Sequence, residues 1–557
     1  MTLTSPPAAT PPAAMTPAQR WTLVATVLGS AMAFLDGTVV NVALPALQRD
    51  FHAGVAGVGW VVNGYALMLA ALILTGGALG DLYGRRRVFG AGVLVFAVAS
   101  LLCGLARSLP LLVAARLLQG IGGALLIPGS LAMIGAVFPA KSRGRAVGLW
   151  SSATSVVTVI GPVLGGVMVD TLSWRLVFLI NLPLAAAVLW CLRNVPESSA
   201  APGSSAYREG MPRPSLDLPG LLLVTAGLGG LSAGLLGAGG GGSGGASWPL
   251  TLAGAALIAA FIWWESRAPA PMMPLALFHS WAFAGTNLLT FLLYGALGAA
   301  LFFLPLNLIN VQGYTAAQAG ASLLPLSLLL AGLSGVFGGL ADRHGPRFFL
   351  TLGPVLAGMG FWLLGRMGVG GSYVVSLLPA VLVLSLGMAL TVAPLTSTVL
   401  SSVGEGRSGT ASGVNNAVSR AAGLLAVALF TLLMVGRFGT SLQTGLSRSD
   451  LPAAAQSQMV AQRSRLAQVQ PPAGLSTPQA QQARRAVRLA FADGFRWVCL
   501  LSGLMAALAG VVGFFSLGRM GPAQGGSAPG GSVPGSSAPG GLSAPRSDGQ
   551  VNTPSGQ

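Results

Sequence analysis

Three charged side chains lie deep inside apolar runs of this chain, where a charge is costly. They are Asp36, Arg116 and Arg420. A charged residue at the centre of a membrane helix costs about 2.5–3.5 kcal/mol on insertion scales, so none of the three is expected to face lipid. Inside a bundle, Asp36 could be a proton carrier that also meets a substrate, or a structural acid bonded to a neighbouring helix. Both interpretations fit the sequence.

The run around Arg116 places polar and small residues on one face. Arg116, Gln119, Gly120 and Gly123 follow one another at i, i+3, i+4 and i+7, so they share one side of a helix. Arg116 could tune the protonation of a carboxylate in the interior, or it could be a fixed counter-ion. The sequence does not show whether Arg116 reaches Asp36.

A second polar face surrounds Arg420, which could be a substrate-site charge or a structural link between helices. Ser412, Asn416 and Ser419 precede it on the same side of a helix. Aromatic residues of other runs could line an apolar pocket or serve plain packing. Our candidates for the substrate pocket are Asn41, Gln119, Tyr294, Asn416 and Arg420.

The composition identifies the solvent of most of this surface as lipid. Charged residues make up 8% of the 557 residues, against roughly 25% in soluble proteins, and the mean hydropathy is +0.73. These values exclude a cytosolic enzyme, a secreted disulfide scaffold and a disordered chain. The net charge of +17 comes from scattered short groups, so we expect no nucleic-acid partner.

Residues for metal or cofactor chemistry do not group in the sequence. The three cysteines and three histidines have no ligand spacing, and no GxxxxGK[ST] loop for ATP occurs. We therefore expect no metal, no cofactor and no enzymatic activity. A membrane-embedded enzyme would need an acidic site or a base in a large loop, and a sensor would need a signalling domain. Both are remote alternatives.

Fourteen runs are apolar enough to cross a bilayer, which takes about 20 residues. They lie at 21–44, 58–79, 88–107, 110–138, 146–169, 174–193, 218–238, 248–265, 282–309, 317–341, 348–368, 374–400, 410–435 and 494–518. The sequence thus predicts an all-α integral membrane protein.

Arginine and lysine in short loops set the orientation, since they concentrate on the cytoplasmic side. Sixteen fall on one side: Arg20, Arg85, Arg86, Arg87, Lys141, Arg143, Arg145, Arg193, Arg208, Arg213, Arg267, Arg343, Arg347, Arg407, Arg519 and Arg546. Four fall on the other: Arg49, Arg107, Arg175 and Arg366. Both termini are therefore predicted to be cytoplasmic.

One motif occurs twice, 261 residues apart, as GALGDLYGRR at 77–86 and GGLADRHGPR at 338–347. The first six runs occupy too few residues for that distance, so two extra helices must lie between the copies. A parallel six-plus-two-plus-six duplication is typical of a two-half transporter. The predicted parts are a disordered cytoplasmic tail 1–20, a six-helix bundle 21–193, a linker with two extra helices 194–281, a second bundle 282–518 with an external loop 436–493, and a disordered tail 519–557.

Eight stretches in order resemble the major facilitator superfamily, and more narrowly its fourteen-spanner drug:proton antiporters of the EmrB/QacA type. They are LDGTVVNVALP (35–45), GALGDLYGRRR (77–87), LLVAARLLQGIGGA (111–124), the Gly-Pro region 148–166, WRLVFLINLP (174–183), PMMPLALF (271–278), PLTSTVL (394–400) and GTASGVNN (409–416). Val157 departs from the family's glycine.

The resemblance implies roles for several residues. Asp36 and Arg116 would couple transport to protons. A gating motif would comprise Gly77, Asp81, Gly84 and Arg86 with the second copy Gly338, Asp342, Gly345 and Arg347. Asp81 would face the helix that begins near 409–412. Gly161, Pro162, Gly165 and Gly166 would bend the fifth membrane helix.

The sequence is therefore interpreted as a proton-coupled exporter of lipophilic drugs or toxic compounds in a bacterial cell membrane. An exporter of one endogenous metabolite or lipid is the alternative. We expect a monomer whose partners are small lipophilic substrates, protons and the bilayer, and a periplasmic adaptor protein stays an open partner. Asp36 is the one acid placed deep in a run, against the bases Arg116 and Arg420, so we expect lipophilic neutral compounds or monocations to be exported and dications to be exported poorly.

Overall fold

The computed structural model describes residues 15–198, 216–237, 247–403 and 408–517, and every regular element in these ranges is a helix. The predicted tails lie outside the described residues, except at the start. The first helix begins at Pro17, where Thr16 and Gln19 form a reciprocal capping box. Residues 17–20 therefore belong to a helix and not to a disordered tail.

The first half of the chain forms α1 (Pro17–Asp50), α2 (Val55–Tyr83), α3 (Arg85–Gly104), α4 (Leu109–Val137), α5 (Ala140–Thr171), α6 (Leu176–Leu179) and α7 (Asn181–Leu192). The connecting region forms α8 (Leu218–Leu236), α9 (Trp248–Glu265) and η1 (Leu275–His279). The second half forms α10 (Trp281–Asn310), α11 (Ala316–Ala321), α12 (Leu324–His344), α13 (Pro346–Gly365), η2 (Tyr373–Leu377), α14 (Leu378–Ser401), α15 (Ser408–Ser447), α16 (Ala453–Ala461), η4 (Arg463–Gln468) and α17 (Thr477–Ser516).

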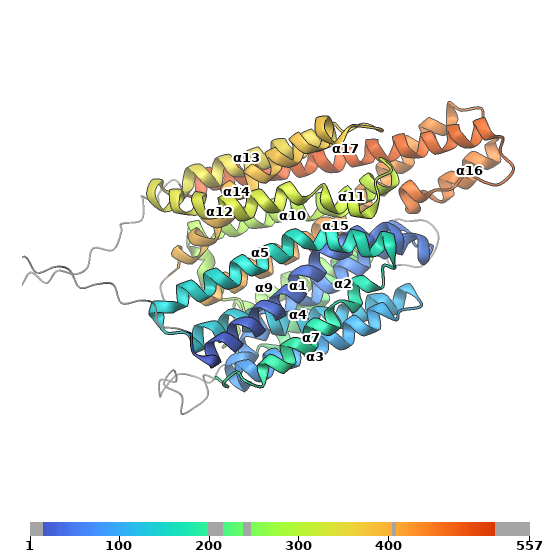
Figure 1. The fold of residues 1–557 in the computed structure, drawn as a ribbon. Helices are drawn as coiled ribbons and strands as arrows, with labels where there is room; N and C mark the ends of the chain where they lie inside the picture. Colours follow the sequence, from blue (N-terminus) through green and yellow to red (C-terminus); the bar gives the residue numbers. More distant parts are fainter. Residues whose placement is uncertain (1–14, 199–215, 238–246, 404–407, 518–557) are drawn as a thin grey trace, which may run out of the picture.

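Thirteen helices in the described ranges are long and apolar enough to cross a membrane, and we take the shorter apolar segment Leu176–Leu192 as the fourteenth crossing. The chain runs back and forth along one axis (Figure 1). The all-helical membrane fold expected from the sequence is confirmed. Because the crossings are even in number, the described chain begins and ends at the same end of the bundle. We call this the inner end and the opposite one the outer end.

The duplicated motif has the same backbone in both copies. Gly84 ends α2 with φ +102°, and Gly345 ends α12 with φ +86°. A positive φ is easy for glycine and strained for other residues, so each copy makes the same sharp turn into the next helix. The duplicated sequence motif therefore corresponds to a duplicated turn at the inner end.

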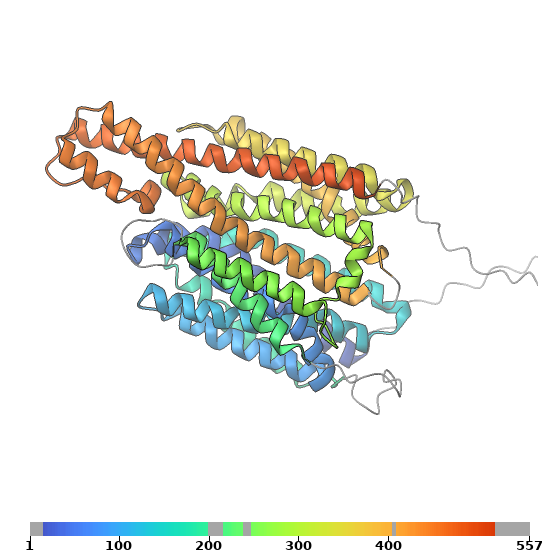
Figure 2. The ribbon, with the colours of Figure 1, turned by 180° about the vertical axis from the view of Figure 1, so that it is seen from behind.

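The inserted helices α8 and α9 lie along the seam between the halves. α8 packs on α2 of the first half and on α15 of the second (Figure 2). Leu228 of α8 belongs to one apolar cluster with Leu67 and Leu424. α9 packs chiefly on α8 and is otherwise largely exposed. The pair thus covers the α2–α15 side of the seam, whereas the α5–α12 side has no such cover in the described part of the chain.

The region 436–493, expected to be an external loop, is mostly helical. α15 and α17 continue far beyond the length of a membrane crossing and carry α16 between them (Figure 1). Their apolar faces continue as well, because Phe438 and Leu442 are buried with Val487. Gln468 donates a hydrogen bond of 3.0 Å to the carbonyl of Pro45, which joins this hairpin to the first half.

The topology is testable with reporter tags. We expect tags at both termini to be protected from an external probe in intact cells, and a tag inserted after Gln470 to be reactive, because basic loops stay in the cytoplasm. Accessibility of the three tags to an impermeant reagent measures this. Termini on opposite faces would contradict both the orientation and the even number of crossings.

Candidate functional site

Asp36 and Arg116 form an ion pair inside the first half. Nη1 of Arg116 lies 2.5 Å from Oδ2 of Asp36, and both side chains are fully buried. The pair joins α1 to α4. The contact that the sequence left open is therefore present, and it explains how two charges are tolerated in the interior, since buried charges need partners.

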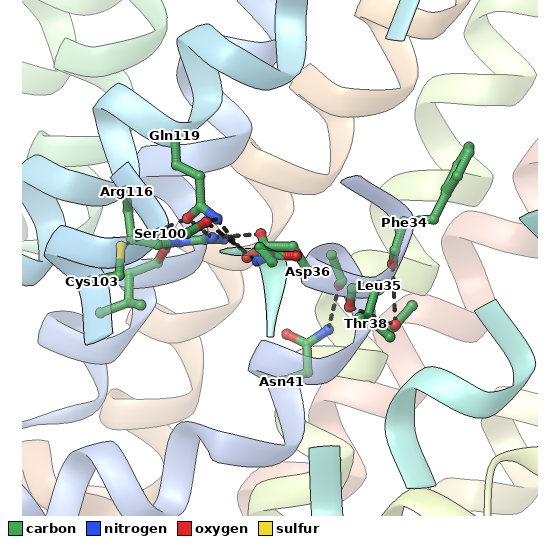
Figure 3. A network of polar contacts seen from close by, with 12 residues as sticks. Phe34, Leu35, Asp36, Thr38, Asn41, Ser100, Cys103, Arg116 and Gln119 are labelled. Carbon is green, nitrogen blue, oxygen red and sulfur yellow. Dashed lines mark hydrogen bonds and ion pairs between the residues drawn. The ribbon is translucent and has the colours of Figure 1, made fainter. Parts of the chain in front are cut away.

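Gln119 completes the pair from one turn further along α4 (Figure 3). Its Nε2 donates to Oδ1 of Asp36 at 2.8 Å and to Oγ of Ser100 at 2.9 Å, while its Oε1 accepts from Arg116 at 2.6 Å. Both carboxylate oxygens of Asp36 thus have a donor. The spacing of Arg116 and Gln119 on one helix face makes this clamp possible.

Aromatic rings and a backbone carbonyl hold the rest of the guanidinium. Nε of Arg116 donates to the carbonyl of Val61 at 2.9 Å, and the guanidinium carbon lies 4.5 Å from the ring centre of Tyr65 and 5.7 Å from that of Phe178. Such cation–π contacts are strongest where water is excluded. The arginine is therefore fixed from α2, α4 and the α6 segment.

The opposite face of α1 borders two neighbouring cavities between the halves, which share Phe34 in their walls and which we together call the central cavity. One part, of about 470 Å³, is lined mainly by α1, α5, α10 and α12, with Trp150, Pro162 and Leu330 among its apolar residues. A second part, of about 290 Å³, is lined by α10, α14 and α15 and is more polar. Phe34 belongs to both walls. In Figure 3 it points away from Arg116, on the other side of α1 from Asp36.

The candidate pocket residues divide between these two places. Asn41, Tyr294, Asn416 and Arg420 line the cavity. Gln119 is fully buried in the ion-pair network instead.

Asp36 likewise lies on the face of α1 that is turned away from the cavity, where it is fully buried. It therefore contributes no charge to the cavity wall in this conformation. Asp36 and Arg116 satisfy each other inside the first half, so of the three intramembrane charges only Arg420 lines the cavity among the described residues. The expected preference for neutral compounds or monocations assumed that Asp36 gives the cavity a negative charge, and in this conformation it does not.

The outer end of the cavity is closed by backbone packing between α5 and α11. A Cβ atom on Gly166 would collide with the carbonyl of Ala316, and one on Gly320 with the carbonyl of Pro162. Gly161 and Gly165 permit an equally close approach to Thr38 and Val39 on α1. α5 continues as one helix through Pro162, so these residues act here by close packing, and their role in bending stays a prediction.

Asp170 adds a polar contact to this closure that the sequence did not reveal. Its two carboxylate oxygens accept from the backbone amides of Ala316 and Ala317, at 3.0 and 2.7 Å. The capping box of Thr315 and Gln318 marks the start of α11, and it could have been found in the sequence. The sequence could not show that an acid of the other half, Asp170, accepts from the backbone amides at this helix start.

The first gating motif is held within its own half. Asp81 accepts from Nε and Nη2 of Arg85, at 3.0 and 2.8 Å, and Nη1 of Arg85 reaches the carbonyl of Ala132. The backbone N–H of Arg86 donates to Glu197, and its side chain donates to the carbonyl of Val195. The expected contact of Asp81 with the start of α15 is not among the hydrogen bonds of the described residues.

The second copy of the motif is more open. Asp342 is exposed, and Arg347 donates to the carbonyl of Phe514 and lies 4.0 Å from the centre of its ring. Gly77 lies near Pro128 of α4, whereas Gly338 lies near Ala393 of α14. The two copies share their turn but differ in their polar contacts, and their gating role stays a prediction.

The sequence and the fold both match known transporters. The family model described as Major Facilitator Superfamily matches residues 26–216 and 218–427. The chain is 32% identical over 499 residues to a tetracenomycin C resistance and export protein of Streptomyces glaucescens, covering 89% of this chain and 91% of that one. It is 36% identical over 440 residues to the multidrug resistance protein Stp of Mycobacterium tuberculosis, covering 77% and 79%.

Among solved structures, a bacterial homologue of the human lysosomal transporter Spinster matches with a TM-score of 0.62 at 18% identity. The match covers 92% of this chain and all of that one. At this identity the likeness shows the fold alone.

Disrupting the ion pair should destabilise the protein unequally. Arg116→Ala leaves a buried carboxylate with Gln119 alone, so we expect a loss of about 3 kcal/mol or more. Asp36→Asn should cost less, because Arg116 keeps Gln119, Val61 and two rings. Thermal unfolding in detergent measures the difference. Arg175→Gln, in the half-exposed pair with Asp50, is the control and should cost less than about 1 kcal/mol.

Removing the Asp170 contact should loosen the outer end. The parent protein carries Thr38→Cys in the cavity. We expect an impermeant maleimide added outside to label this cysteine severalfold faster when Asp170→Ala is added than in the parent. The native cysteines are buried and should stay silent. Asp493→Ala, which breaks an outer ion pair within the second half, should leave the rate unchanged. Equal rates in all three proteins would contradict a closing role for Asp170.

Proposed function

Because the chain belongs to the major facilitator superfamily of membrane transporters, we propose that it exports lipophilic drug-like compounds in exchange for protons. The family consists of transporters and not of enzymes. That the chain is a membrane protein with many crossings and a relative of drug and antibiotic export proteins follows from the matches and the fold. Proton coupling and the roles of individual residues belong to the proposal.

The observation that carries the proposal is the position of Asp36 beside the cavity. α1 has the ion pair on one face and the cavity wall on the other, with Asp36 and Thr38 only two residues apart. Protonation of Asp36 would remove the charge that holds Arg116 and would loosen α1 from α4. Because Phe34, Thr38 and Asn41 move with α1, a proton bound behind the helix changes the wall that a substrate meets.

In the proposed cycle, closure of the outer end restricts the access of the proton and the substrate to the cavity to one side of the membrane at a time. With α5 packed on α11, the cavity is bounded toward the inner end by Trp150 and Ser334, on helices that the inserted pair does not cover. Opening the outer end and closing the inner end would expose the same cavity to the other side. One charge crossing 100 mV contributes roughly 2.3 kcal/mol, which is enough to drive uphill export.

Export of one endogenous metabolite is the second candidate. The relatives include proteins named for the export of a single antibiotic, tetracenomycin C in one case and cephamycin in another. A biosynthetic cluster beside the gene would favour this candidate, and a neighbouring repressor or adaptor gene would favour broad drug efflux.

The coupling proposal is tested with Asp36→Asn in inverted membrane vesicles. We expect an imposed proton gradient to drive accumulation of a lipophilic dye by the wild type and not by this variant, because an amide cannot release a proton. Asp450→Asn removes the same charge from the exposed outer hairpin and should transport normally. Gradient-driven accumulation by the Asp36→Asn protein at the wild-type rate would remove Asp36 from the mechanism.

A further inference from the structure

The walls of the central cavity carry one formal charge, and it is positive. Among the described residues that line its two parts there is no Asp, Glu, Lys or His, and Arg420 is the single charged side chain. The buried acid of the first half, Asp36, is enclosed behind α1 with Arg116 and Gln119. The electrostatics of the cavity are therefore set by one guanidinium.

Arg420 has no counter-ion within the described part of the chain. Five ion pairs are found there, and none includes Arg420, nor does any hydrogen bond or ring contact. The phenol of Tyr294 lines the same part of the cavity as Arg420. Arg116, the other intramembrane arginine, has a carboxylate, an amide, a carbonyl and two rings. Unlike Arg116, Arg420 is thus a charge in the membrane interior with no anionic partner among the described residues, and a bound anion would supply one.

We propose that the cavity selects lipophilic monoanions, whose acidic group binds Arg420 while the apolar body lies against α5 and α12. This inference rests on the export function proposed above and names its substrate class.

The two parts of the cavity fit the two ends of such a compound. The smaller part gathers polar groups around Arg420, among them Ser412, Asn416 and Ser419 on the same helix and Tyr294 on α10. These groups can donate hydrogen bonds to a carboxylate or phenolate. The larger part is mostly apolar, with Trp150, Pro162, Leu297 and Leu326. Their volumes, about 290 and 470 Å³, together suit a drug-sized molecule, and Phe34, which lines both parts, is the side chain that a compound spanning them would have to pass.

The alternative charges fit the cavity less well. A cation would add a second positive charge beside Arg420 with no lining carboxylate to offset either one. A neutral compound would leave Arg420 without a counter-ion. An anion also gains from the membrane potential, since its exit and a proton's entry both carry charge in the direction that an interior-negative potential favours.

The test compares three probes that share one ring system: anthracene-9-carboxylate, anthracene-9-methanol and 9-(aminomethyl)anthracene. Binding to the purified full chain in detergent at neutral pH is measured by equilibrium dialysis against protein-free micelles. We expect the carboxylate to bind at least roughly tenfold more tightly than the alcohol, since hydrogen bonds to a charged partner are the strong ones. The amine should bind most weakly.

Variants assign the preference to Arg420. Arg420→Gln should bring the carboxylate and the alcohol within about twofold, whereas Arg420→Lys should keep most of the preference. Arg448→Gln removes an exposed arginine just after α15 and should behave as the wild type. If Arg420→Gln does not fold, the Lys variant and the three-probe comparison in the wild type still decide. Equal affinities in the wild type, tighter binding of the amine, or an undiminished preference in Arg420→Gln would each overturn the proposal.

The binding assay is separate from transport. Carboxylate selectivity without gradient-driven transport would contradict the proposed function and leave the selectivity standing. Gradient-driven export of a cationic dye, together with equal binding of the three probes, would support the export function and overturn the anion preference.

Discussion

A pair of opposite charges buried in the first half is the constraint around which this structure is arranged. Asp36 and Arg116 lie where water is excluded, so each needs the other, and Gln119, Val61 and Tyr65 occupy their remaining positions. Such a pair contributes little net stability compared with apolar packing, yet breaking it is costly. A group that is costly to leave unpaired and can take up a proton is suited to change the position of a helix.

The charged residue of the cavity wall, Arg420, belongs to the second half of the protein. Arg420 belongs to α15, and the acid of the ion pair faces away from it behind α1. In the proposed mechanism, proton binding and substrate binding therefore use different groups, on opposite sides of α1. Communication between them would run through the body of α1, whose residues Phe34 and Thr38 are both cavity wall and close neighbours of Asp36.

The two ends of the bundle are joined by different kinds of contact. At the outer end, glycines bring backbones of α5 and α11 together, and Asp170 reaches across to two amides. At the inner end, Asp81 is held by Arg85 of its own half. α8 meanwhile packs on both α2 and α15 along the seam, whereas the inserted pair does not cover the opposite side, between α5 and α12.

The sequence by itself determined the number of crossings, their alternation and the repeated turn at Gly84 and Gly345, because hydrophobic length and backbone freedom are local properties. It also marked Asp36, Arg116 and Arg420 as charges that must avoid lipid. Only the tertiary structure decided which of them meet. Whether a side chain on α1 faces α4 or the cavity depends on how the helix is rotated against its neighbours, and the apolar pattern of a membrane helix fixes that rotation weakly. In the folded protein Asp36 pairs with Arg116, whereas Arg420 faces the cavity without a counter-ion among the residues described.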